Sequence, residues 1–301
     1  MRGAGSRPTG PNSSYPSPPA AAMPLDFAIP QLLVVSDRSG PTAVAKSDGL
    51  PFAVEDGALR TAAKFGPRPR GVPVPAALFA APHNRSHVFV ARVADQPGPD
   101  APLAFHFLVL NRPLYEALGD PFAVADRFPP AWAARGGLPV LAWPGEPLPS
   151  RKIADIAEVL KVGDGPLLLG ATQSLLDGGR LMLKRDAPDE SVLRAVWQLL
   201  PTRTRCDLWP ATFAFSNALG FHAVALPELP AKLPLGYLSE EQVKDYPEGR
   251  YELALQTAAE GGNQADLDRL FARASSRDML RLATAMVLGA VGVAAVAKFL
   301  R

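Results

Sequence analysis

The sequence predicts an α+β protein with mixed, largely antiparallel sheets and packed helices, followed by C-terminal helices that end in a transmembrane helix. Three observations predict this class. Short runs rich in β-branched and aromatic residues dominate the first half, and longer segments with a helical spacing of apolar residues dominate the second. The third observation is the stretch 282–297, which contains no charged side chain and predicts the membrane segment.

Strands and one helix are predicted in the first half. Residues 87–93 have the sequence HVFVARV and residues 103–110 the sequence LAFHFLVL, the clearest strand patterns in the chain. The loop between them, DQPGPDAP, is rich in turn residues, so the two strands are expected to pair antiparallel. Residues 29–35 and 42–46 are predicted as strands around the turn SDRSGP, and residues 57–65 as a short helix.

Helices are predicted in the second half at residues 151–160, 167–176, 192–200 and 251–259, with a short helix opened by Ser239 and Gln242. Asp186 is expected to cap the helix at 192–200, with Asp189 three residues on. Residues 180–184 are predicted as a strand. Residues 211–215 and 222–226 are predicted as a strand pair across the turn SNALG.

Changes in composition predict five segments along the chain. These are a disordered Pro-rich leader (1–25), a β-rich N-terminal domain (26–150), an α+β domain (151–230), a linker with short helices (231–262), and a basic amphipathic helix with the membrane anchor (263–301). The leader lacks the apolar region of a secretory signal peptide. Residues 127–149, which are rich in tryptophan and proline, are expected to form an irregular covering segment.

The stretch 282–297 predicts a C-terminal membrane anchor. Extended to 279–300, it is long enough to cross a hydrocarbon core of roughly 30 Å at about 1.5 Å per helical residue. Its alternative is a helix rich in alanine and valine that is buried in the soluble core. Because more arginines precede the stretch than cations follow it, the prediction is a single C-terminal pass through the cytoplasmic membrane with the body in the cytoplasm.

Two residue patterns accompany the anchor. Four arginines recur at every fourth residue before it and form one stripe on a helix: Arg269, Arg273, Arg277 and Arg281. Such a stripe is attracted to anionic lipid, and its alternative is an ordinary solvated helix face. Small residues in the anchor allow a second helix to approach closely: Ala285, Gly289 and Gly292. A homo-oligomer formed through the tail helix is therefore one expectation.

Composition and motifs argue against several function classes and identify no reaction. A net charge of +2 gives no general case for nucleic-acid binding. The chain lacks the P-loop lysine motif, the G-x-S-x-G elbow, H-E-x-x-H and C-x-x-C, and no cofactor is expected. His83 and His87 are four residues apart, but turn residues beside them and the missing third ligand predict no metal site. The single cysteine, Cys206, is expected to be a buried small apolar residue.

Two histidines are the candidate catalytic groups. His106 alternates with phenylalanines in a predicted strand, a pattern more typical of a core or supporting group than of a catalytic base. His222 would form a hydrolytic triad with Ser216 and Asp177, although nothing in the sequence brings the three together. A hydrolase that uses His106 or His222 is therefore kept as an alternative.

The stretch from Leu168 to Pro227 has a recognisable order of elements. It contains a helix ending in a glycine turn, a strand near Arg180, a helix ending in L-L-P, and a phenylalanine-rich strand. This order resembles the N-terminal region of the GTPase-associated proteins of bacterial NTP-dependent conflict systems. The front half is compatible, because QLLVVSDRSGPTAVAKSDGLP looks like the opening strand pair of that family and FHFLVL looks like its histidine-containing strand, with His106 at that position. The resemblance covers residues 30–227, and the loop before His106 lacks the Gly-Arg-Gly-Asn signature.

The resemblance implies a non-enzymatic adaptor or regulator that works with a GTPase. Combined with the anchor, it leads to the expectation of a membrane-tethered adaptor that recruits a protein partner, with anionic membrane lipid as a second partner. Two alternatives remain from other classes. One is the hydrolase described above, and the other is a membrane-perturbing effector in which the tail helix oligomerises.

Overall fold

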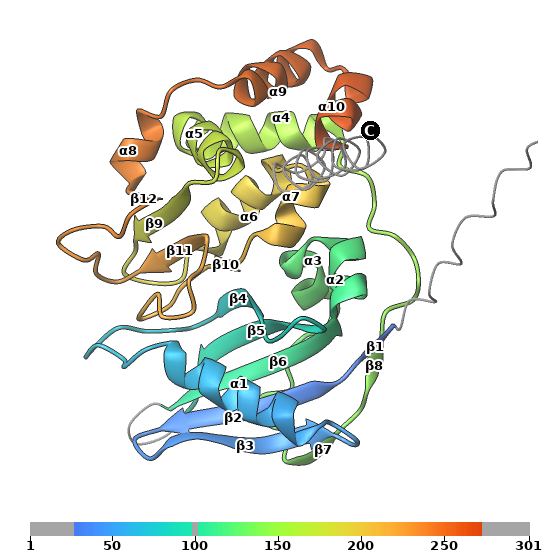
Figure 1. Ribbon diagram of the computed structural model, residues 1–301, viewed down its shortest axis with the longest axis vertical. Helices are drawn as coiled ribbons and strands as arrows, with labels where there is room; N and C mark the ends of the chain where they lie inside the picture. Colours follow the sequence, from blue (N-terminus) through green and yellow to red (C-terminus); the bar gives the residue numbers. More distant parts are fainter. Residues whose placement is uncertain (1–26, 98–101, 273–301) are drawn as a thin grey trace, which may run out of the picture.

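The computed structural model describes residues 27–97 and 102–272 and is drawn in Figure 1. Its strands are β1 (Ala28–Ile29), β2 (Gln31–Asp37), β3 (Gly40–Ser47), β4 (Ala77–Pro82), β5 (His87–Asp95), β6 (Leu103–Asn111), β7 (Gly136–Leu138), β8 (Leu141–Ala142), β9 (Arg180–Lys184), β10 (Pro210–Ala211), β11 (Ala223–Leu226) and β12 (Tyr237–Leu238). Its helices are α1 (Phe52–Lys64), α2 (Arg112–Leu118), α3 (Pro121–Arg127), α4 (Ile153–Val162), α5 (Gly165–Leu176), α6 (Glu190–Leu199), α7 (Thr202–Asp207), α8 (Glu240–Lys244), α9 (Arg250–Gly261) and α10 (Gln264–Phe271).

The strands form one large mixed sheet and one small pair. The ten-stranded sheet has the order β12-β9-β11-β10-β4-β5-β6-β2-β3-β7, and β1 pairs separately with β8. The strands from β10 to β3 pair antiparallel, whereas β7 at one end and β11, β9 and β12 at the other pair parallel with their neighbours. The predicted α+β class, with a mixed, largely antiparallel sheet and packed helices, is therefore confirmed.

The central strands are buried on both faces, which explains their almost continuous apolar sequence. Along β6, Phe105 and Phe107 belong to the core on one face, and Leu108 and Leu110 belong to the core on the other. This alternation follows from the two-residue period of a strand. The predicted antiparallel pairing of β5 with β6 is confirmed, with Phe107 opposite Ala91.

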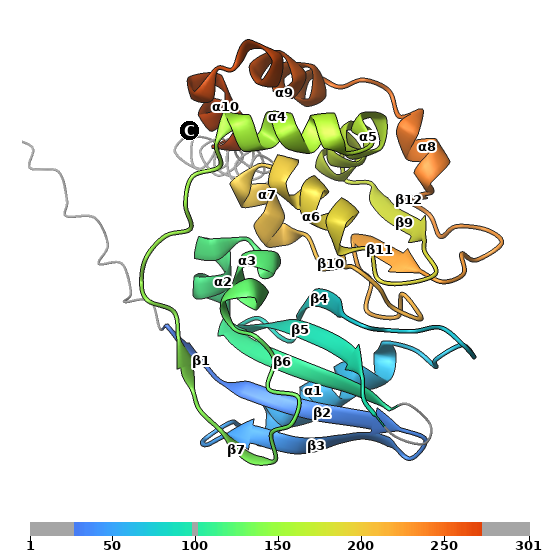
Figure 2. The same cartoon turned by 180° about the vertical axis from the view of Figure 1, so that it is seen from behind.

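Helices cover the two faces of the sheet unequally. On one face α1 packs over β2 and β3, and its residues Val54, Ala58 and Ala62 belong to the same core as the phenylalanines of β4, β5 and β6. On the other face the larger core includes residues of α2, α3, α5 and α6. Figures 1 and 2 show α4, α9 and α10 stacked beyond this second layer, away from the sheet.

Helix α5 is enclosed by its neighbours. Every residue from Leu167 to Leu175 is buried, because α4, α6, α8, α9 and β9 surround the helix. An apolar sequence on all sides is typical of such a helix. Gly170 allows α8 to come close, since a β-carbon at this position would lie 2.1 Å from the carbonyl oxygen of Val243.

The structure corrects two local predictions. Helix α6 is capped by Asp189, whose carboxylate accepts the Val192 N–H at 3.2 Å, and not by Asp186. The strands β10 and β11 run parallel and do not form a hairpin. The chain after β10 stays extended beside other strands and does not turn back at once: Thr212 donates its N–H to Leu78, Phe215 donates its N–H to Phe65, and Ala214 still bonds to Ala225 of β11. The chain therefore loops around before it returns as β11.

The sheet continues across the domain boundary predicted at residue 150. Strand β4 from the first half pairs with β10 from the second, with Phe79 opposite Ala211. The division into segments 26–150 and 151–230 stays a prediction. The leader at 1–25 and the anchor at 279–300 lie outside the described residues. Among the described helices, none has both the length and the apolar character needed to cross a membrane.

Candidate functional site

His106 is buried beneath the segment 127–149, which was predicted to be irregular but contributes β7 to the large sheet and β8 to the small pair. Its Nε2 donates to the side-chain oxygen of Gln31 at 2.8 Å, and its ring meets the ring of Trp132 edge to face at 6.3 Å. The amide nitrogen of Gln31 in turn donates to the carbonyl of Pro139 at 2.7 Å. Burial, with a smaller effect from the Arg92 cation, lowers the pKa of His106 to about 4. The His106 side chain is 1% exposed, and through Gln31 and Trp132 it holds the segment 127–149 to the sheet.

His222 lies far from His106 in the same sheet. It directly precedes β11, and β10, β4 and β5 separate that strand from β6. At about 4.8 Å per strand this is roughly 19 Å. The Nδ1 atom of His222 accepts the Trp209 N–H at 3.1 Å, so this nitrogen fixes a loop. The two histidines therefore do not form a common site.

The triad with His222 is not assembled either. The hydroxyl of Ser216 donates to the carbonyl of Lys64 at 2.9 Å. The carboxylate of Asp177 accepts from Gln173 at 3.0 Å and from Tyr246 at 3.3 Å. Each group is thus bonded to another part of the fold, and the hydrogen bonds needed for a nucleophile and its base are made elsewhere.

The other candidate groups, His83 and Cys206, make contacts that stabilise the fold. The ring of His83 stacks on Phe89 with centroids 4.8 Å apart, and burial lowers its pKa. Among the described residues, no three His, Cys, Asp or Glu side chains gather as a metal site would require. Cys206 is half-buried and not fully buried as expected; its thiol donates to the carbonyl of Glu116 at 3.1 Å, and burial raises its pKa to about 11.

The described part of the arginine stripe is its first member. Arg269 projects from α10 with its side chain 77% exposed and pairs with Asp266, while Leu267 and Phe271 are buried on the other side of the helix. The other members lie outside the described residues, as do the packing residues of the anchor: Arg273, Arg277, Arg281, Ala285, Gly289 and Gly292.

An apolar groove of about 540 Å³ lies between α4, the start of α5 and α6. Its apolar surface includes Val159 and Val162 of α4 and Val192 of α6. Val162 is 75% exposed, so its side chain is accessible to a partner. Figures 1 and 2 show α4 between α9 and α6.

Acidic side chains line the same groove. Asp155 and Glu158 of α4 are exposed, and their carboxylates form no ion pair with another described residue. Asp164 also lines the groove; it caps α5 through the Leu167 N–H and pairs with Lys244 at 2.8 Å. The groove thus combines apolar side chains with two carboxylates that pair with no other residue of the described ranges. An exposed surface of this composition can bind a partner.

Sequence reasoning missed the groove, although the sequence holds a signal for it. Ile153 and Ile156 lie on the side of α4 that packs against the core. Val162 lies on a different side, four residues after Glu158, while Val159, four residues after Asp155, is half-buried against the core. An apolar residue on the exposed side of a helix that already buries another side indicates a second contact surface.

Comparison with protein-family models, with curated proteins and with solved structures finds no match to this chain.

Proposed function

We propose that the protein is a membrane-tethered, non-enzymatic adaptor that recruits a protein partner to the cytoplasmic membrane. The groove between α4, α5 and α6 is the observation that carries this proposal. The C-terminal stretch 279–300 supplies the tether, and a GTPase is the partner implied by the family that the sequence resembles.

The chemistry of the groove specifies its occupant as an amphipathic helix with basic residues beside its apolar face. Helices bind grooves of this kind by inserting apolar side chains at helical spacing. Val159, Val162 and Val192 provide the apolar contacts. The carboxylates of Asp155 and Glu158 attract lysine or arginine at the edge of such a helix, which increases specificity and the association rate.

Site-specific photocrosslinking in cells tests this proposal. A photoreactive amino acid is placed at Val162, which is exposed in the groove, and at Val140, a control position that is 48% exposed and lies between β7 and β8. We expect a discrete adduct with another protein from position 162 and none from position 140.

Charge reversal separates groove binding from chance proximity. Asp155→Lys with Glu158→Lys should reduce the adduct about ten-fold, since each unpaired rim charge is converted into a repulsive one. The matched control is Asp186→Lys with Glu228→Lys, at two exposed carboxylates away from the groove. Three results would contradict the proposal. The adduct is reduced equally in both double variants, it forms equally from positions 162 and 140, or it forms only with residues 273–301 of the same chain.

A further inference from the structure

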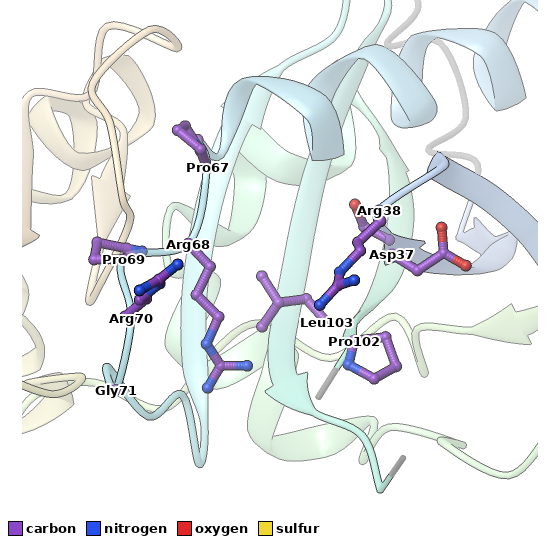
Figure 3. Close-up of a pocket in the computed structure, with 11 residues that line it drawn as sticks. Asp37, Arg38, Pro67, Arg68, Pro69, Arg70, Gly71, Pro102 and Leu103 are labelled. Atoms are coloured by element: carbon purple, nitrogen blue, oxygen red, sulfur yellow. The ribbon is translucent and has the colours of Figure 1, made fainter. Parts of the chain in front are cut away.

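A second cavity, of about 690 Å³, carries three arginines and shares no residue with the groove. It lies between the β2–β3 turn, the loop that follows α1, and the start of β6 (Figure 3). Arg38 comes from the turn, Arg68 and Arg70 come from the loop, and Leu103 contributes an apolar wall. The volume is within the range of about 300–1,000 Å³ that is usual for small-molecule sites.

The loop that carries Arg68 and Arg70 is held at its beginning by backbone contacts. The carbonyl of Phe65 accepts the N–H groups of Phe215 at 2.9 Å and Ser216 at 3.0 Å. Gly66 then has a φ of +105°, and a β-carbon there would lie 2.9 Å from the Ser216 nitrogen. Only glycine combines this backbone conformation with so close an approach.

Arg68 fixes the rest of the loop. Its Nε and one terminal nitrogen donate to the carbonyl of Val72 at 2.9 and 2.8 Å, and the other terminal nitrogen pairs with Asp95 at 2.8 Å. Asp95 also accepts the Val74 N–H at 2.8 Å. In Figure 3, Arg68 extends to the opposite side of the loop from Pro67 and Pro69, whose rings limit backbone freedom. The arginine loop is therefore ordered before any ligand arrives.

Among the described residues that line the cavity, positive side chains outnumber negative ones. These are Arg38, Arg68 and Arg70 against one carboxylate, Asp37, and Arg68 is also paired with Asp95 beside the cavity. The Asp37 carboxylate accepts the N–H and the hydroxyl of Ser39 at 2.8 and 2.6 Å, and these bonds lower its pKa. In Figure 3 it points away from the arginine loop. Asp37 thus shapes the turn that presents Arg38.

Arg70 is the group most available to a ligand. It is exposed and forms no hydrogen bond or ion pair with another described residue. Arg68 lines the same cavity, but its contacts to Val72 and Asp95 give it a positioning role, so Arg70 is the group that a ligand would contact first.

We propose that this cavity binds a ligand through a phosphate group. Planar guanidinium groups match the oxygens of phosphate in pairs, and a phosphate compensates more positive charge than a single carboxylate does. The prolines and Leu103 leave apolar surface for the rest of the ligand. The phosphate could belong to a soluble metabolite or to a lipid headgroup, and the two sources require separate probes.

Calorimetric titration of the full-length protein with two probes tests the proposal. Pyrophosphate represents the soluble source, and short-chain phosphatidic acid below its micelle concentration represents the lipid headgroup. We expect saturable binding of one probe and a loss of affinity of about ten-fold or more in Arg70→Ala, as for the removal of one charge-assisted contact. Arg38→Ala is expected to weaken binding as well. The probe that binds more tightly identifies the source.

Arg85→Ala is the matched control, because Arg85 is an exposed arginine in the turn at the far end of the β4–β5 hairpin. Its affinity should equal that of the unmodified protein. Two results would overturn the proposal: no saturable binding of either probe, or the same affinity change in Arg85→Ala as in Arg70→Ala. Urea unfolding of each variant shows whether it is folded, and exposed substitutions should shift stability by less than about 0.5 kcal/mol. The adaptor proposal does not depend on the outcome, since crosslinking from Val162 tests the groove, which is a different surface.

Discussion

His106 is kept neutral in the folded protein, and this makes stability depend on pH. Its pKa falls from 6.5 to about 4 on folding, chiefly because the ring is buried. Between these values the unfolded chain binds a proton that the folded chain does not bind, so stability falls as the pH falls. At 1.36 kcal/mol per pKa unit, the loss from this group reaches about 3 kcal/mol.

His106→Gln should remove that contribution, because glutamine can bond to Gln31 without titrating. The measurement is urea unfolding of both proteins from pH 7 to pH 4. The unfolding free energy of the variant, relative to that of the unmodified protein, should rise by about 3 kcal/mol over this range. Two curves that stay parallel would show that His106 titrates normally in the folded protein.

At the scale of single residues, the sequence predicted which side chains are buried better than it predicted their hydrogen-bond partners. The alternation of His106 with Phe105 and Phe107 correctly indicated a buried strand position. Its partner Gln31 is 75 residues away in the chain, and the register that joins them is set by the β2–β6 pairing. Such a pairing is a property of the whole sheet and is not written in either segment.

Helix α6 offers a test of how its first turn is stabilised. Asp189 caps the helix at Val192 and also binds the guanidinium of Arg185 at 2.6 Å. Asp186 is exposed and makes no hydrogen bond or ion pair with another described residue. Asp189→Ala should therefore lower the unfolding free energy by about 1–2 kcal/mol, whereas Asp186→Ala should change it by less than about 0.5 kcal/mol.

Urea unfolding at neutral pH gives both values on the same scale. If Asp186→Ala were the more destabilising change, the assignment of the cap to Asp189 would be wrong. The two aspartates lie in one short segment, and each substitution removes one carboxylate. Each variant therefore serves as the control for the other.

At the scale of elements, helices and long strands were predictable and short pairings were not. The strands at 87–93 and 103–110 and the helix at 167–176 follow from local patterns of apolar residues. The parallel pairing of β10 with β11 depends on where Thr212 and Phe215 find hydrogen-bond partners, which lie in β4 and after α1. The close approach of α8 to Gly170 is likewise a tertiary contact.

At the scale of the whole molecule, the sequence predicted the α+β class but not the two candidate sites. The groove needs three helices, α4, α5 and α6, to meet, and the arginine cavity needs a turn, a loop and a strand from separate parts of the chain. The local signals were present in both cases, as Val162 on α4 and as the run GPRPRG at residues 66–71. Only the fold shows that each signal belongs to a concave surface.

Locating the Val162 crosslink in fractionated cells shows whether the protein brings a partner to the membrane. The full-length protein is compared with a variant lacking residues 279–301, each with the photoreactive amino acid at position 162. The account predicts the adduct in the membrane fraction for the full-length protein and in the soluble fraction for the truncated one. An adduct that is soluble in both proteins, or that fails to form in either, would contradict it.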